Sequence, residues 1–199
     1  PSLSWEITTM RLCLSAALVL LPSLAVAADA AEPVREIMNT ATNNWADLAG
    51  DNDNPPDYVD YFNDEFLPRL YSKDFVARYR EAAKYPAYED GGSPFDYDVI
   101  AMGQDGCSIK DLKIEAAPAV AGVTTVKTTF DNTHCFGERA ADWKPAEVDF
   151  KVVEEDGRPV IDDILRPQDG EPGSLKAELA EIAKEGANPQ LDLEGNSPE

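Results

Sequence analysis

The carboxylate of Asp163 is the side chain in this sequence with the clearest potential for chemistry. It belongs to the second of two predicted strands, and the Asp156-Gly157 turn between them supplies the two positive-φ positions of a type I′ hairpin. Centring the hairpin on this turn pairs Lys151 with Asp162 and Phe150 with Asp163. The residues that would share the face of Asp163 are Phe150, Val152, Ile161 and Leu165. A carboxyl group in an apolar pocket has a raised pKa and can act as a general acid or base, although a one-residue slip would reverse the faces.

His134 and Tyr97 are the other two candidate catalytic residues. His134 is the only histidine, and it lies beside Cys135 in a predicted loop. No nucleophile and base occur at a recognisable spacing. The competing interpretation of Asp163 is therefore structural, because the Val160–Ile164 string can cap or pair locally.

The sequence predicts no metal site and no cofactor. A Walker loop, G-x-G-x-x-G, H-E-x-x-H and C-x-x-C are all absent from the chain. The run that begins at Asp51 opens like a calcium loop, but Pro56 replaces the required Gly and Phe62 the required Glu. One His and two cysteines that we expect to be oxidised leave too few ligands for a transition metal.

The beginning of the chain has the three parts of a bacterial secretory signal. A short basic segment at Met10-Arg11 precedes an apolar run, and Ala25-Val26-Ala27 fits the cleavage rule. We therefore expect a signal peptide over residues 10–27, with cleavage after Ala27 or after Ala30, and translated upstream residues at 1–9. The expected location is periplasmic or secreted, with no stable membrane insertion after cleavage.

The cysteine content agrees with export. Cys13 would leave with the signal peptide, and Cys107 and Cys135 would remain as an even pair. In an oxidising compartment we expect these two to form a disulfide that closes a loop of about 28 residues. The chain-entropy estimate for such a loop is roughly 3–4 kcal/mol.

Composition bounds the class of protein and its partners. The chain has 199 residues and 43% hydrophobic content, which suit one globular domain once a leader and a tail are removed. The formal net charge of −21 makes nucleic-acid binding unfavourable, because neutralising phosphates requires a basic surface. It suits a basic partner instead.

Helices are predicted first, then strands, then a last helix. Apolar spacing predicts helices at 32–48, 58–62 and from 68 or 72 to 84, and strands at 108–116, 120–131 and on each side of Asp156-Gly157. Ser174 is the expected N-cap of the closing helix and Gly186 its C′ residue. We expect one α+β domain over residues 32–186, with about four antiparallel strands, followed by a disordered acidic tail at 187–199.

The second full helix carries the one basic patch in the predicted domain. Its members are Arg69, Lys73, Arg78, Arg80 and Lys84. Asp74 and Arg78 are spaced for an ion pair, which favours a solvated helix face. A site for an anionic ligand or for an acidic partner surface is the alternative.

Several short strings give the chain a family resemblance. They are Phe95-Asp-Tyr-Asp98 with Gly103-Gln-Asp105, Val160-Ile-Asp-Asp-Ile164 and Gly173-Ser-Leu175. In this order they resemble the exported bacterial proteins of the domain of unknown function 3828 (DUF3828) family, within the nuclear-transport-factor-two-like, or cystatin-like, superfamily. The resemblance implies a curved sheet that wraps helices into a cone, often with an internal pocket and often dimeric. It implies no activity.

We therefore expect an uncharacterised exported protein that acts as a non-enzymatic binding module. It would hold a small apolar or amphipathic ligand or a protein partner, with an immunity or inhibitor role as one version. The candidate ligand-binding residues are Phe150, Val152, Ile161 and Tyr79. The alternative is a small pocket enzyme of isomerase or hydrolase type that uses Asp163.

Overall fold

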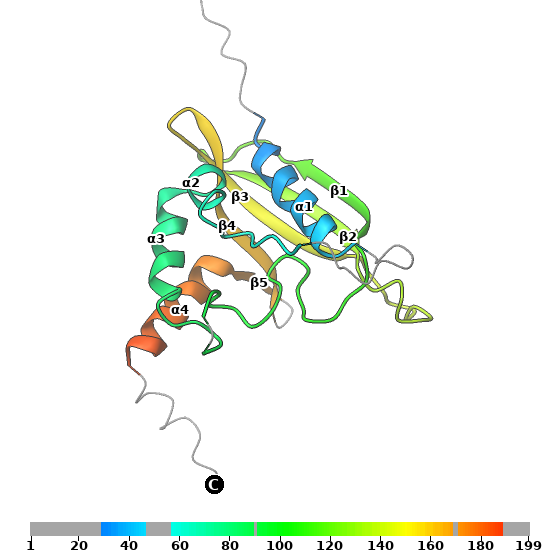
Figure 1. The fold of residues 1–199 in the computed structure, drawn as a ribbon. Coiled ribbons are helices and arrows are strands. Elements are labelled where there is room, and N and C mark those ends of the chain that lie inside the picture. The colour runs from blue at the N-terminus through cyan, green and yellow to red at the C-terminus, as the bar shows by residue number, and fades with distance from the viewer. Residues whose placement is uncertain (1–28, 47–56, 90, 169–170, 189–199) are drawn as a thin grey trace, which may run out of the picture.

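The computed structural model describes residues 29–46, 57–89, 91–168 and 171–188. The elements are α1 (Glu32–Asn44), α2 (Leu67–Leu70), α3 (Lys73–Ala82), β1 (Lys110–Ala116), β2 (Thr124–Asp131), β3 (Ala146–Glu155), β4 (Arg158–Gln168), β5 (Glu171–Ser174) and α4 (Leu175–Ala187) (Figure 1). The predicted leader at 10–27 and the residues before it lie outside the described residues. So does the predicted tail, except for Ala187, which ends α4, and Asn188, which caps it.

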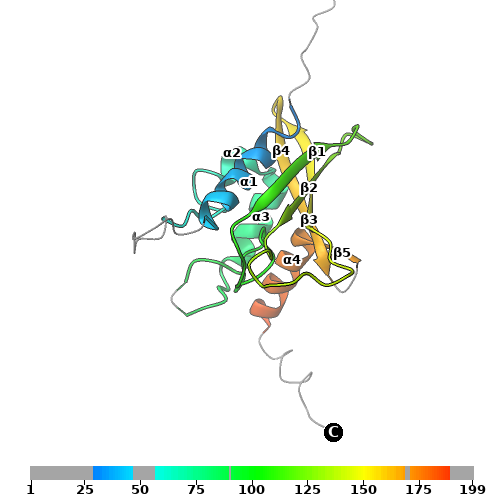
Figure 2. The same ribbon diagram turned by 90° about the vertical axis from the view of Figure 1, so that its right-hand side faces the viewer.

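The five strands form one antiparallel sheet in the order β1-β2-β3-β4-β5. The sheet is curved and the helices pack on one of its faces (Figures 1 and 2). The predicted α+β class is confirmed, and the sheet has one strand more than expected. The extra strand is β5, whose sequence Glu-Pro-Gly-Ser reads as a turn and becomes a strand only because β4 pairs with it.

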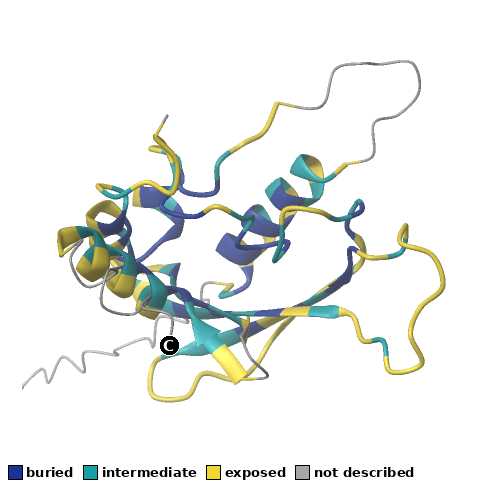
Figure 3. Ribbon diagram, turned by 90° about the horizontal axis from the view of Figure 1, so that it is seen from below, coloured by how far each residue is buried: buried dark blue, intermediate teal, exposed yellow. Residues whose placement is uncertain are grey.

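The core lies between the helices and the covered face of the sheet (Figure 3). Val148, Phe150 and Val152 alternate along β3 as predicted and are at most 2% exposed. Aromatic rings from the helices and loops fill the space above them, with Phe62 and Tyr79 centred 4.8 Å apart. The hollow of the curved sheet is therefore packed with side chains.

Ser72 decides where the third helix begins. Pro68 lies in the short helix α2, Tyr71 returns to an extended conformation, and Ser72 then caps α3. The single helix predicted from Pro68 or Ser72 to Lys84 is therefore two helices: α2, of which Pro68 is the second residue, and α3, which Ser72 caps and which ends at Ala82. The helix predicted at 58–62 is wrong, because this segment is irregular and then turns, and the Asn63 side chain accepts from the backbone N–H groups of Glu65 and Phe66.

Gly186 lies inside α4 and is not its C′ residue, so this prediction is wrong. A Cβ atom at this position would lie 2.2 Å from Cγ of Tyr85. The helix can pass Tyr85 only without a side chain there. The glycine therefore marks a close contact, and Asn188 is the C-cap.

A β-bulge in β4 overturns the predicted hairpin register. Val152 pairs with Ile161 as expected, but the register shifts at Asp162. Lys151 then pairs with Asp163 and not with Asp162, and Phe150 pairs with Ile164 and not with Asp163. The extra residue places Asp163 on the opposite face from Phe150, so Asp163 does not belong to the apolar face on which the sequence placed it.

The sheet opens where β3 and β4 diverge. Their ladder ends at the Asp149–Leu165 pair, although β3 continues to Ala146 beside β2 and β4 continues to Gln168 beside β5. Two residues further on, the ladder would place Pro167 opposite Glu147, and proline has no N–H to donate. The two strands part at this point and leave a cleft between them.

Candidate functional site

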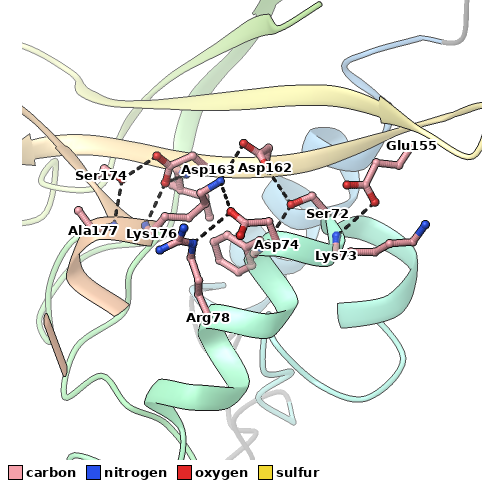
Figure 4. A network of polar contacts seen from close by, with 12 residues as sticks. Ser72, Lys73, Asp74, Arg78, Glu155, Asp162, Asp163, Ser174, Lys176 and Ala177 are labelled. Atoms are coloured by element: carbon pink, nitrogen blue, oxygen red, sulfur yellow. Dashed lines mark hydrogen bonds and ion pairs between the residues drawn. The ribbon is translucent and has the colours of Figure 1, made fainter. Parts of the chain in front are cut away.

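Asp162 links β4 to the start of α3 (Figure 4). Its carboxylate accepts a hydrogen bond from the Ser72 hydroxyl at 2.7 Å, and the Ser72 oxygen accepts from the Phe75 backbone N–H at 3.0 Å. The Lys176 ammonium group lies 3.0 Å from Asp162 and 2.7 Å from Asp74. Burial opposes the charge of Lys176, but hydrogen bonds to both carboxylates outweigh it and raise the pKa of the lysine.

Asp163 links β4 to the start of α4 (Figure 4). Its carboxylate accepts from the Ser174 hydroxyl at 2.6 Å and from the Lys176 backbone N–H at 3.0 Å. The Ser174 oxygen accepts from the Ala177 backbone N–H at 3.1 Å, so the predicted N-cap is confirmed. A third bond comes from the Ile164 backbone N–H at 2.8 Å. This geometry makes Asp163 an anchor of the helix start.

The other two candidate catalytic residues have separate partners. His134 is half-buried, with Nε2 3.0 Å from the Ser108 carbonyl oxygen. The Tyr97 hydroxyl donates to Glu178 at 2.6 Å, and burial together with this bond raises the pKa of Tyr97. Neither contacts Asp163 in the described residues, so the structure brings no catalytic set together from the three.

The candidate ligand-binding residues are part of the core. Phe150, Val152, Ile161 and Tyr79 are at most 5% exposed. None of them lines any of five cavities found in the described part of the chain. The predicted internal pocket is therefore replaced by packed side chains at this place.

The predicted disulfide between Cys107 and Cys135 is confirmed, with the two Cα atoms 5.8 Å apart. Cys107 precedes β1 and Cys135 follows β2, and the Cys107 backbone N–H also donates to the Asn132 carbonyl at 2.8 Å. The bond fastens the loop after β2 to the beginning of the edge strand.

The predicted basic patch is largely neutralised. The expected Asp74–Arg78 pair is present at 3.1 Å, and Arg69 binds both oxygens of Glu36 at 2.5 Å. The other two paired members are Lys73, with Asp156, and Lys84, with Glu81. These pairs favour the solvated-face interpretation over an anion site.

The largest of the described cavities is the cleft between β3 and β4, which we call the sheet cleft. Its volume is about 600 Å³. The apolar part of its wall consists of Met102, Pro145, Ala146, Leu165, Pro167 and Pro172. The polar part consists of Lys144, Glu147, Asp149 and Arg166. A volume of this size accommodates a small molecule or a short peptide.

Asp149 and Arg166 give the sheet cleft its chemistry. Oδ1 of Asp149 and Nε of Arg166 are buried and have no hydrogen-bond partner among the described residues. Burial raises the pKa of Asp149, partly offset by Lys127. The rest of the Arg166 guanidinium pairs with Glu178 and lies 5.0 Å from the ring centre of Tyr97. Asp149 and Arg166 thus bring a carboxylate and a guanidinium group, each with one unpartnered buried atom, to a wall that also holds apolar side chains.

Sequence reasoning missed this cleft, although one signal was available. Pro167 stands in the predicted strand, where a proline signals that pairing ends or lies at an edge. Asp149 looked like the polar half of an ordinary alternating strand. Its partial burial depends on neighbours from other parts of the sheet, such as Lys127 and Leu165, which no local pattern encodes.

Neither family models nor curated proteins nor solved structures gave a match to this chain. The resemblance to the DUF3828 family therefore stays a prediction. The helices of the described segments are too short or too polar to cross a bilayer. In those same segments no group of three or more His, Cys, Asp or Glu side chains is arranged to hold a metal ion.

Proposed function

We propose that this protein is an exported, non-enzymatic binding module that holds a small amphipathic ligand in the sheet cleft. The observation that carries the proposal is a cavity of about 600 Å³ whose wall combines six apolar residues with Asp149 and Arg166, each of which has one buried polar atom without a partner among the described residues. A buried polar atom without a partner costs free energy, which a ligand with matching groups would recover.

The chemistry of the wall defines the ligand. Asp149 calls for a hydrogen-bond donor and Arg166 for an acceptor, and one amide or hydroxyl-bearing head group can supply both. Pro145, Leu165 and Pro172 offer apolar surface to a short alkyl chain or ring. A purely anionic head group suits the site less well, because it would face the Asp149 carboxylate.

The Cys107–Cys135 disulfide supports the exported location, because disulfides persist mainly in oxidising compartments. Native mass spectrometry of protein from the periplasm, without reduction, would test this part. An intact pair and an N-terminus at Ala28 or Ala31 would support export. A full-length reduced chain in the cytosolic fraction would contradict it.

The binding test uses octanamide, whose amide both donates and accepts and whose chain is apolar. We expect a titration followed by ¹H–¹⁵N NMR to shift the signals of Ala146, Asp149, Leu165 and Arg166 selectively. The replacement Leu165→Trp should weaken binding about tenfold or more by filling the cleft. Glu154→Trp adds the same ring at an exposed site near the turn of the hairpin and should leave binding unchanged.

Octanoate is the matched ligand control. Its carboxylate has no donor for Asp149 and should bind about tenfold more weakly than the amide. Tighter binding of octanoate would contradict the role of Asp149. Failure of octanamide to bind the folded protein, or binding that Leu165→Trp leaves intact, would overturn the sheet cleft as the site.

A further inference from the structure

A second hollow shares none of the lining residues of the sheet cleft, although Arg166 of the cleft lies 5.0 Å from the ring centre of Tyr97 in the wall of this hollow. It is a cavity of about 380 Å³ that adjoins one of about 180 Å³, and the two share Tyr58, Ser93, Phe95, Tyr97 and Asp98 in their walls. We call the two together the tyrosine groove. It is built from the segment after α1 and from the loops between α3 and β1.

The tyrosine groove exposes large aromatic surface. Tyr58 is 63% exposed and Tyr88 is 55% exposed, and Val59 beside Tyr58 is 40% exposed. Only two other large hydrophobic residues of the described chain are this exposed, Val120 and Phe136, and neither lines this groove. Exposed tyrosines gathered in one place are typical of protein-binding hot spots.

The charges in the groove have one sign. Its walls contain Asp60, Asp96 and Asp98, and no Lys, Arg or His is among the described residues that line either cavity. Burial raises the pKa of Asp60, as expected for a carboxylate without a cationic partner nearby. Partial burial of the Tyr58 hydroxyl, with smaller contributions from the Asp98 and Asp60 carboxylates, raises its pKa to about 12.

Asp98 is held rigidly at the base of this groove. One carboxylate oxygen accepts from the Trp45 indole N–H at 2.7 Å and from the Tyr61 hydroxyl at 2.8 Å. The other accepts from the Ile100 and Ala101 backbone N–H groups, both at 2.8 Å. The carboxylate is therefore fixed in place before any partner arrives.

From this combination we infer that the tyrosine groove binds an arginine or lysine side chain presented by a basic partner protein. Aromatic faces attract a cation through their quadrupole, and the three carboxylates add a charge that the groove itself does not neutralise. The formal net charge of −21 would steer a basic partner toward the molecule, and the exposed tyrosines would fix where it docks. The inference is independent of the proposed ligand in the sheet cleft.

The test compares two small probes that differ in charge. N-acetyl-arginine methylamide and its citrulline counterpart have nearly the same shape, but only the first is a cation. We expect ¹H–¹³C aromatic NMR titrations to shift the ring signals of Tyr58, Tyr88 and Trp45, with citrulline about tenfold weaker. Equal binding of the two probes would overturn the inference, because stacking alone would then explain it.

Paired variants separate the groove from the general acidity of the surface. Tyr58→Ala with Tyr88→Ala should abolish the arginine-induced shifts, whereas Val120→Ala with Phe136→Ala removes equally exposed apolar groups elsewhere and should change nothing. Circular dichroism would confirm that both double variants fold. Shifts that persist in the tyrosine variant, or a preference for neutral oligosaccharides such as maltotriose over arginine, would also overturn it.

Discussion

Asp162 and Asp163 are adjacent in sequence, yet they hold different helices. The bulge turns the two carboxylates apart, so that Asp162 reaches Ser72 before α3 and Asp163 reaches Ser174 before α4. Each serine then caps its own helix. Asp163, which the sequence singled out for possible chemistry, thus has a structural task that accounts for its position, and its catalytic role stays a prediction.

The replacement Asp163→Ala tests this structural task. It leaves the Ser174 hydroxyl and the Lys176 backbone N–H without their acceptor, and we expect a loss of about 1–3 kcal/mol in the free energy of unfolding. Urea unfolding followed by circular dichroism would measure it. Asp142→Ala, at an exposed loop position, should change stability by less than about 0.5 kcal/mol. An equally small effect at Asp163 would contradict the capping role.

Asp149 predicts a pH dependence of stability. Because burial raises its pKa, the folded state binds the proton more tightly than the unfolded chain, so ionisation destabilises the fold as pH rises through the interval between the two pKa values. Asp149→Asn removes this penalty and should raise Tm at pH 7 by about 1–3 °C, a modest gain because the group is partly exposed. The gain should shrink toward pH 4. A gain that is constant with pH would show that ionisation is not its cause.

At the scale of the elements, α4 depends on a contact that its own sequence does not encode. Alanine is normally about 1 kcal/mol better than glycine inside a helix. At Gly186, however, a Cβ atom would collide with the Tyr85 ring. The local preference and the tertiary contact therefore act in opposite directions.

We expect Gly186→Ala to destabilise the protein by about 1–3 kcal/mol, against helix propensity. Removing the ring with Tyr85→Ala should reverse the sign, so that alanine at position 186 becomes neutral or stabilising in that background. A double-mutant cycle by thermal unfolding would measure the coupling. Additive effects of the two changes would mean that the ring does not constrain the helix.

Features that are determined by residues close together in the sequence could be predicted, whereas features that depend on distant residues could not. The alternation in β3, the Ser174 cap and the Asp156-Gly157 turn are local patterns, and all three are confirmed. The bulge at Asp162 is not determined locally. It orients Asp162 and Asp163 toward Ser72 and Ser174, which lie 90 and 12 positions from Asp162 in the sequence. Strand β5 likewise has no strand-like sequence and depends on its partner.

At the scale of the whole molecule, the sheet cleft and the tyrosine groove depend on residues that are distant in sequence, and neither coincides with the predicted internal pocket. The sequence placed the pocket inside the curved sheet, where apolar residues would meet, but aromatic side chains fill that space. The sheet cleft and the tyrosine groove instead form at the margins, where strands part or loops meet. Their residues, such as Asp149 and Tyr88, carry no local signature that distinguishes them from ordinary surface positions.

The two edge strands of the sheet, β1 and β5, also affect whether copies of this protein can join through their sheets. The outer strand β1 loses its regular register between Lys110 and Lys113, where Asp111 takes a φ of 53°. The opposite strand β5 has four residues, and one of them is Pro172. Neither offers a long straight row of free amides to a neighbouring chain, so edge-to-edge growth into fibrils is disfavoured. We therefore expect concentrated solutions to resist amyloid formation.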